Sequence, residues 1–120
     1  MEQIFAQLKT LLQAYQPPFT PKHDEPGTYD LWSFKDVEIA GRKRKEIYFA
    51  GLIIQKGYVG FYFMPVYGDP EIKRVFQPEL LKLLKGKSCF HIKKLDETLL
   101  AQIKKALEIG FRSYQEQGWV

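Results

Sequence analysis

The chain has 120 residues, of which 45% are hydrophobic and 15% aromatic, so we predict one folded domain over residues 1–120 rather than a disordered chain. The single cysteine, Cys89, excludes an internal disulfide and any site built from several thiolates, and Lys plus Arg exceed Asp plus Glu by 18 to 14. The opening residues lack a signal-peptide pattern and no apolar run approaches the length of a membrane span. We therefore expect a soluble, cytoplasmic protein without a membrane partner.

The first predicted element is an amphipathic helix over residues 2–16, which Pro17 ends. A proline-rich connector over 17–27 follows, and strand-forming residues then fill 29–34 and 37–40. The two longest predicted strands, 45–55 and 58–66, are joined by a tight turn at Lys56-Gly57. This order indicates an antiparallel β-meander.

The two faces of the 45–66 hairpin are both apolar. If Gln55 pairs with Tyr58, one face is continuous and suited to covering by helices. The second face includes Gly51 and Gly60, which leave a shallow region that can accept a ligand, a partner or a neighbouring aromatic ring. We expect it to bind a small apolar or aromatic ligand, or a second copy of the chain to form a dimer. The residues assigned to this ligand or interface site are Trp32, Phe49, Gly51, Ile53, Gly60, Tyr62, Met64 and Tyr67.

The second half of the chain is predicted to be mainly helical. A turn after Tyr67 leads into a short helical segment, and a further helix begins at Pro78 and ends at Gly86. A strand over 88–93 precedes a last helix, which Asp96 is expected to cap. The order α-β(3-4)-α-β-α favours an α+β fold, with an antiparallel sheet of about five strands packed by two long helices and one short one.

The stretches YFMPVY (62–67) and GKSCF (86–90) are the strongest pieces of a resemblance that covers about residues 28–120. The chain resembles the YdhG-like family of small bacterial domains of unknown function. The resemblance implies a fold similar to frataxin. Because some members are described as frataxin-like iron chaperones, it also implies iron as a ligand and iron-using assembly proteins as partners.

Candidate iron ligands are sparse in this sequence. Hard iron ions prefer clustered carboxylates and imidazoles, yet the first helix contains Glu2 as its only carboxylate. The nearest substitute metal site is His23, Asp24 and Glu25 in the connector, followed along the chain by further carboxylates at 30, 36 and 38. The alternative interpretation of these residues is a solvated loop. No other cofactor is predicted.

No enzyme motif is recognisable. Cys89 and His91 share one face of a predicted strand, a spacing that suits a thiolate–imidazole pair but is more typical of a buried cysteine beside a sheet histidine. The GKS sequence at 86–88 follows a predicted helix and lacks the earlier glycine of a phosphate-binding loop. We therefore predict a non-enzymatic protein.

Two groups of basic residues stand out. The first, Arg42, Lys43, Arg44 and Lys45, forms a turn that can neutralise phosphates, so nucleic-acid contact is a weaker alternative function. The second, looser set is Lys82, Lys85, Lys87, Lys93 and Lys94. Because no nucleic-acid recognition motif accompanies them, solvated surface positions are the favoured interpretation and nucleic acid is not expected as a partner.

Overall fold

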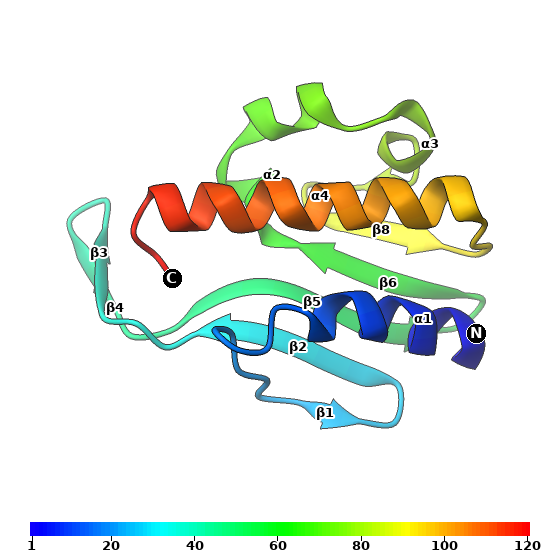
Figure 1. Cartoon of the computed structure of the whole chain (residues 1–120), viewed down its shortest axis with the longest axis horizontal. Helices are drawn as coiled ribbons and strands as arrows, with labels where there is room; N and C mark the ends of the chain where they lie inside the picture. The colour runs from blue at the N-terminus through cyan, green and yellow to red at the C-terminus, as the bar shows by residue number, and fades with distance from the viewer.

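The computed structural model describes residues 1–120, except for the side chain of residue 70. It confirms an α+β fold with a six-stranded antiparallel sheet in the order β1-β2-β5-β6-β8-β7 (Figure 1). The strands are β1 (Asp24–Glu25), β2 (Thr28–Ser33), β5 (Ile47–Gln55), β6 (Tyr58–Phe63), β7 (Leu84–Lys85) and β8 (Cys89–Ile92). The count exceeds the expected five because the two-residue strands β1 and β7 extend the two edges.

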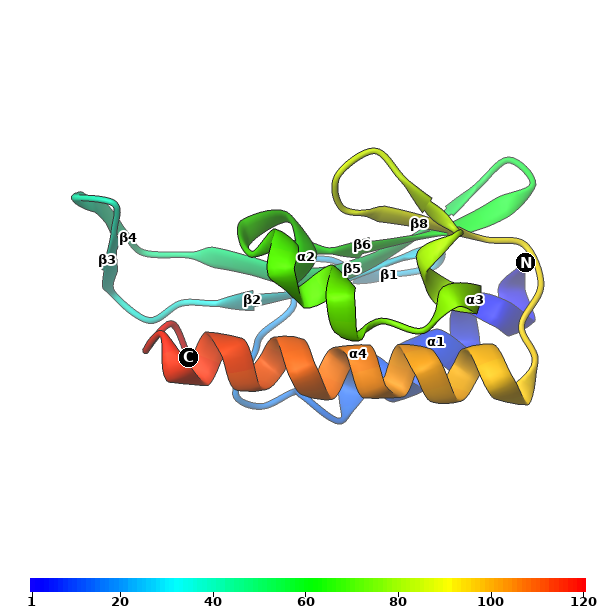
Figure 2. The ribbon, with the colours of Figure 1, turned by 90° about the horizontal axis from the view of Figure 1, so that it is seen from above.

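Two long helices cover one face of the sheet. Helices α1 (Glu2–Gln13) and α4 (Glu97–Glu116) lie side by side on this face, and no helix covers the opposite face of the described structure (Figure 2). The shorter elements lie towards the β8 edge: α2 (Met64–Gly68), the 3-10 helix η1 (Pro70–Val75) and α3 (Pro78–Leu81). Within the described residues, no helix has both the length and the hydropathy required to cross a membrane.

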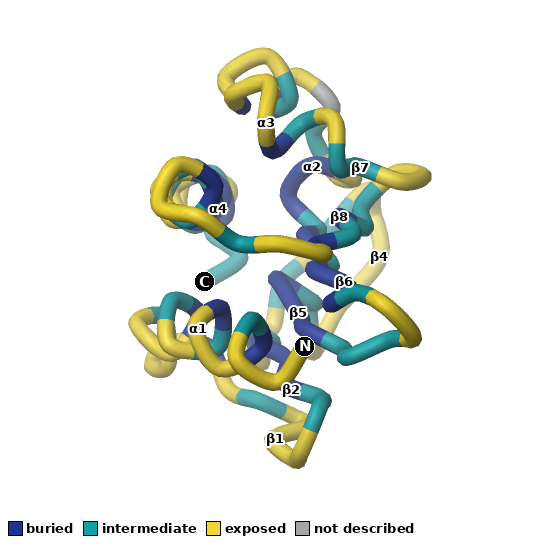
Figure 3. Tube along the Cα trace, turned by 90° about the vertical axis from the view of Figure 1, so that its right-hand side faces the viewer, coloured by how far each residue is buried: buried dark blue, intermediate teal, exposed yellow. Residues whose placement is uncertain are grey.

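The hydrophobic core lies between the sheet and the two long helices. Alternate sheet residues face the helices and are fully buried, which Figure 3 shows as dark blue on the inner strands and on the inner sides of α1 and α4. The sheet residues with no exposed surface on this covered face are Tyr29, Leu31, Phe49, Ala50, Leu52, Val59, Phe61, Phe63, Phe90 and Ile92. The expected cap of α4 is confirmed, because Asp96 Oδ1 accepts a hydrogen bond from Leu99 N at 2.8 Å.

The predicted register of the central hairpin is confirmed, with Gln55 opposite Tyr58 and Ala50 opposite Phe63. A β-bulge, however, interrupts the pairing of β2 with β5, where Leu31 pairs with Ala50 and Trp32 pairs with Tyr48.

The bulge leaves Phe49 as the extra residue, and it corrects one expected site position. Phe49 lies in the core, where its ring stacks on Phe19 with 4.3 Å between ring centroids, and not on the second face. The hydroxyl of Tyr114 donates to the Tyr48 carbonyl oxygen at 2.7 Å, which satisfies a backbone acceptor at the bulge. The sequence prediction is wrong here because strict alternation across the strand does not allow for an extra residue.

Several predicted boundaries also change. Strand β6 ends at Phe63, because Pro65 occupies the first turn of α2, so Met64 and Tyr67 belong to a helix rather than to the sheet. Helix α3 ends at Leu81, and Leu84 already pairs with Phe90 in the β7–β8 hairpin. Gly86 therefore supplies a positive φ of 71° in a hairpin turn instead of ending a helix.

A separate two-stranded hairpin projects from one end of the molecule (Figure 1). It consists of β3 (Val37–Ile39) and β4 (Arg42–Arg44), which pair only with each other. Its turn residues Ala40 and Gly41 both have positive φ, 53° and 79°, as a two-residue hairpin turn requires. The strand predicted at 37–40 thus exists but lies outside the main sheet.

Candidate functional site

The candidate site is the sheet surface that faces away from α1 and α4, which we call the open face. The pairing of Asp30 with Gly51, Gly51 with Tyr62 and Tyr62 with Cys89 places these side chains in one row across four strands. The neighbouring row contains Ile53, Gly60 and His91. Residues on the open face include Asp30, Trp32, Tyr48, Gly51, Ile53, Tyr58, Gly60, Tyr62, Cys89 and His91.

The two glycines on the open face are covered by aromatic rings of the chain itself. A Cβ atom at Gly51 would lie 1.9 Å from the Tyr48 hydroxyl oxygen, and one at Gly60 would lie 3.1 Å from the Tyr62 ring. The region without side chains therefore receives neighbouring aromatic rings, which is one of the three outcomes expected from the sequence. Two tyrosine rings rest close against the sheet backbone as a result.

Two stacked ring pairs lie on the open face. Trp32 and Tyr48 have ring centroids 4.7 Å apart and an interplanar angle of 20°. Tyr58 and His91 have centroids 3.9 Å apart and an angle of 14°. Lys22 Nζ lies 3.8 Å from the Trp32 ring centroid, in cation–π geometry, and also pairs with a glutamate. All four rings lie outside the core and are partly exposed.

Of the expected ligand or interface residues, the structure brings together Trp32, Gly51, Ile53, Gly60 and Tyr62. It removes Phe49, Met64 and Tyr67 from the open face, for the reasons given above. Tyr58 and His91 are additional members, and alternation along their strands could have assigned both. No sequence signal could have assigned Tyr48, because its position depends on the bulge.

Burial favours the neutral forms of three titratable groups on the open face, Tyr48, Tyr62 and Cys89. Burial raises the pKa of Tyr48, and the nearby Asp30 charge adds to that effect. Burial also raises the pKa of Tyr62 and the pKa of the Cys89 thiol, although a hydrogen bond from Tyr62 opposes the shift at Cys89. Cys89 is thus a protonated thiol at neutral pH and a poor nucleophile.

Asp30 is the buried anion at the edge of the open face and is 8% exposed. Its Oδ1 accepts hydrogen bonds from the backbone N–H groups of Lys22 at 2.7 Å and His23 at 2.9 Å, and its Oδ2 lies 2.6 Å from His23 Nδ1. Burial acts to raise the Asp30 pKa, but these hydrogen bonds outweigh it and the pKa is lowered. The Trp32 indole also lowers this pKa, although its buried N–H makes no hydrogen bond of normal geometry. Asp30 therefore anchors the connector to the sheet.

Each of the three residues predicted to bind a metal has a different environment in the structure. His23 is held by Asp30, Asp24 forms an ion pair with Lys9 at 2.6 Å, and Glu25 is exposed on strand β1. Among the described residues, no group of three or more His, Cys, Asp or Glu side chains gathers at a position that could hold a metal ion.

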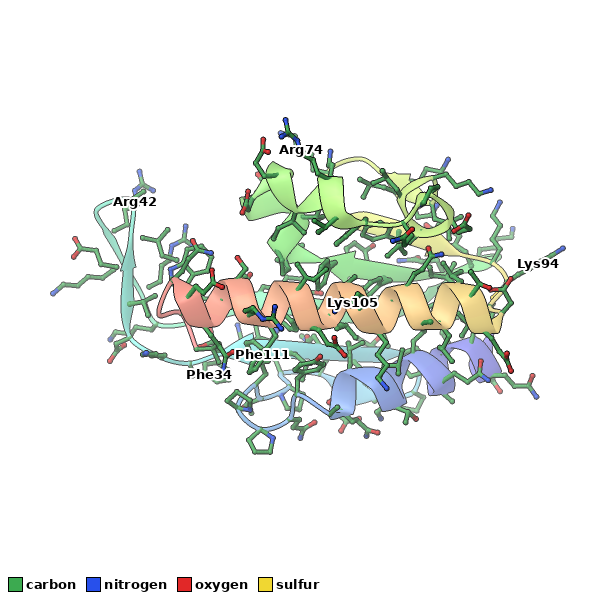
Figure 4. All side chains as sticks on the ribbon, turned by 45° about the horizontal axis from the view of Figure 1, so that its top comes forward. Phe34, Arg42, Arg74, Lys94, Lys105 and Phe111 are labelled. Carbon is green, nitrogen blue, oxygen red and sulfur yellow. The ribbon has the colours of Figure 1, made fainter. Side chains whose placement is uncertain are left out.

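The predicted basic turn occupies the projecting hairpin, away from the open face. Arg42, Lys43, Arg44 and Lys45 are all exposed, and Figure 4 shows Arg42 directed outwards from the hairpin tip. A shallow depression beside this hairpin is lined by Lys43, Arg44 and Lys45 together with Asp36 and Glu38. The two carboxylates partly offset the positive charge that would attract a phosphate.

No protein-family model matches the chain, and no curated protein and no solved structure matches it significantly. The YdhG-like resemblance and the frataxin-like arrangement therefore stay predictions from the sequence, and a function has to be inferred from the geometry of the described residues.

Proposed function

We propose that the chain is a non-enzymatic binding module whose open face takes a flat, uncharged ring by stacking. The observation that carries this proposal is the pair of ring stacks, Trp32 with Tyr48 and Tyr58 with His91, on a sheet surface that no helix covers. Stacking on such rings contributes about 1–3 kcal/mol per ligand ring. The raised pKa values of Tyr48, Tyr62 and Cys89 support a neutral ligand and a binding rather than a catalytic role.

The chemistry of the open face favours a ligand over a second copy of the chain. A stable protein interface needs a central apolar cluster that becomes fully buried on association. The large hydrophobic side chains exposed on the described surface are Met1, Phe34, Tyr67 and Val75, and they all lie off the open face. The rings on the open face instead carry hydroxyl and imidazole groups, which can select a ligand by hydrogen bonding.

Calorimetric titration tests this proposal. Three uncharged flat probes, adenosine, riboflavin and indole, are titrated into the full chain. We expect at least one probe to bind, and we expect Tyr48→Ala to weaken it about tenfold because one stacking surface is lost. Gly60→Trp, which places a large ring against Tyr62, should block binding as well.

Tyr67→Ala is the matched control, since it removes an exposed aromatic ring from α2 and not from the open face. It should leave the affinity unchanged. The proposal is wrong if none of the three probes binds up to its solubility limit, or if Tyr67→Ala weakens binding as much as Tyr48→Ala does. If size exclusion with light scattering shows a dimer that Tyr48→Ala abolishes, the open face is a dimer interface and not a ligand site.

A frataxin-like iron chaperone is the alternative function, and the orientation of His23 is the observation that bears on it. A carboxylate can only accept hydrogen bonds, so Asp30 fixes Nδ1 of His23 as a donor and leaves Nε2 free on a half-exposed side chain. Anaerobic calorimetric titration with ferrous iron tests this alternative. Micromolar binding of ferrous iron that is abolished by His23→Gln would support the iron-chaperone alternative. A titration without measurable heat would exclude it.

A further inference from the structure

A depression of about 480 Å³ lies where α3, the β7–β8 hairpin and the start of α4 meet. Its size falls within the range of small-molecule sites, and it is larger than a single inorganic ion requires. We call it the lysine depression after four of its lining residues, Lys82, Lys85, Lys93 and Lys94. Leu83 and Leu99 supply apolar lining, and Glu79, His91 and Asp96 complete it.

The positive charges of the lysine depression are only partly offset by the chain. None of its four lysines forms an ion pair with any side chain that the structure describes. Both of its carboxylates are engaged in local hydrogen bonds: Glu79 Oε1 accepts from the Gln102 side chain at 2.6 Å, and Asp96 caps helix α4. Four lysines against two carboxylates leave an excess of positive charge around one concave surface.

The lysines come from three separate segments of the chain. Lys82 follows α3, Lys85 lies on β7, and Lys93 and Lys94 follow β8. Figure 4 shows Lys94 at the end of the molecule where α4 begins, with its side chain extended into solvent. Like charges brought together by the fold repel one another unless an anion lies between them, and flexible ammonium groups can close on such an anion.

We propose that the lysine depression binds an organic phosphate, with the phosphate group among the lysines and the organic part against Leu83 and Leu99. A multiply charged phosphate matches several ammonium groups better than a monovalent carboxylate does, because each phosphate oxygen accepts charge-assisted hydrogen bonds. The apolar lining explains why an organic phosphate fits better than the bare ion. This site shares His91 with the Tyr58–His91 stack of the open face but includes neither ring of the Trp32–Tyr48 stack.

Calorimetric titration with two probes, inorganic phosphate and phenyl phosphate, tests the proposal on the full chain. We expect both to bind, phenyl phosphate the more tightly because its ring contacts the apolar lining, and we expect the double variant Lys82→Gln/Lys85→Gln to weaken both at least about tenfold. The matched control is Lys56→Gln/Lys104→Gln, which removes the same charge from exposed positions elsewhere and should change affinity less than about twofold. Tyr48→Ala should leave both affinities unchanged, so this test can fail or succeed separately from the stacking proposal.

Three results would overturn the proposal: no binding of either probe by the unaltered chain, equal losses in the two double variants, or tight binding of a thymidine hexanucleotide without binding of the small phosphates. The second would show a general effect of net charge, and the third would show that the lysines serve a nucleic-acid backbone. Unfolding by urea should have the same midpoint in both lysine double variants as in the unaltered chain, because the substituted lysines are exposed.

Discussion

The two faces of the sheet use the same strands but are stabilised differently. On the covered face, Phe61 and Phe63 are fully buried against the helices, and α4 comes so close that a Cβ at Gly110 would lie 2.5 Å from the Phe63 ring. On the open face, no helix supplies contacts, and the tyrosine rings at 48 and 62 lie over glycines of the same sheet. The comparison indicates that helix packing buries the covered face, whereas the residues of the open face are packed mainly against one another and stay partly exposed.

The largest expected difference between the faces is seen at two neighbouring residues of β6. Phe61→Ala should lower the free energy of unfolding by about 3–5 kcal/mol, because it leaves a cavity in the core. Tyr62→Ala, on the open face, should cost about 1 kcal/mol or less, because its ring is only partly buried. Urea unfolding of both variants measures the difference. Equal losses would show that the open face carries as much of the stability as the covered face.

A second, smaller effect is expected where the connector meets the open face. Asp30→Asn should lower the free energy of unfolding by about 2 kcal/mol at neutral pH, because three hydrogen bonds to a buried carboxylate are weakened. The folded-state pKa of Asp30 is lowered, so its stabilisation is present above the unfolded-state pKa and is lost as pH falls through the folded-state pKa.

Urea unfolding at a series of pH values from neutral to strongly acidic tests this pH dependence. The gap between the original chain and Asp30→Asn should narrow as the solution becomes acidic. A gap that stays constant down to the lowest pH would mean that the charge of Asp30 contributes nothing to its hydrogen bonds.

The smallest predicted effect concerns the glycine under Tyr48. Gly51→Ala should cost about 1–2 kcal/mol, because the new Cβ would force the Tyr48 ring outwards. In the double variant, Tyr48→Phe should restore part of the lost stability. Without the hydroxyl, the ring atom nearest to the new Cβ at position 51 is a carbon 3.0 Å away.

A double-mutant cycle measured by urea unfolding gives this coupling energy. Gly110→Ala is the control on the covered face, where the clash is with Phe63 and Pro65 and Tyr48→Phe should provide no recovery. Additive losses for Gly51→Ala and Tyr48→Phe would show that the Tyr48 ring does not rest on this glycine.

The central hairpin was predictable in register because its pattern is local. The glycine in the turn at Lys56-Gly57 and the alternation on both sides of it specify which residues pair, and the structure has those pairs. The end of β6 was missed because YFMPVY continues the apolar pattern, whereas Pro65 has no N–H to donate to the sheet and suits the first turn of a helix. The helix expected through Gly86 is shorter because residue 84 pairs with Phe90 in the β7–β8 hairpin, which the helical spacing of the leucines in 80–84 does not indicate.

The candidate site was predictable only in part. Trp32, Gly51, Gly60 and Tyr62 were placed together by alternation alone, and the structure has them on one face. The presence of Tyr48 on the open face in place of Phe49 was not predictable, because it depends on the ring of Phe19 and the hydroxyl of Tyr114. The lysine depression likewise depends on three segments meeting in space.

The sequence by itself determined the α+β class, the central register and the cap of the last helix, because period, turn chemistry and capping act over a few neighbouring residues. Only the tertiary structure decided which aromatic rings face the helices and which lie on the open face. The physical reason is that the bulge, which turns Phe49 into the core and Tyr48 onto the open face, is stabilised by Phe19 and Tyr114, and these residues are far from it in the chain.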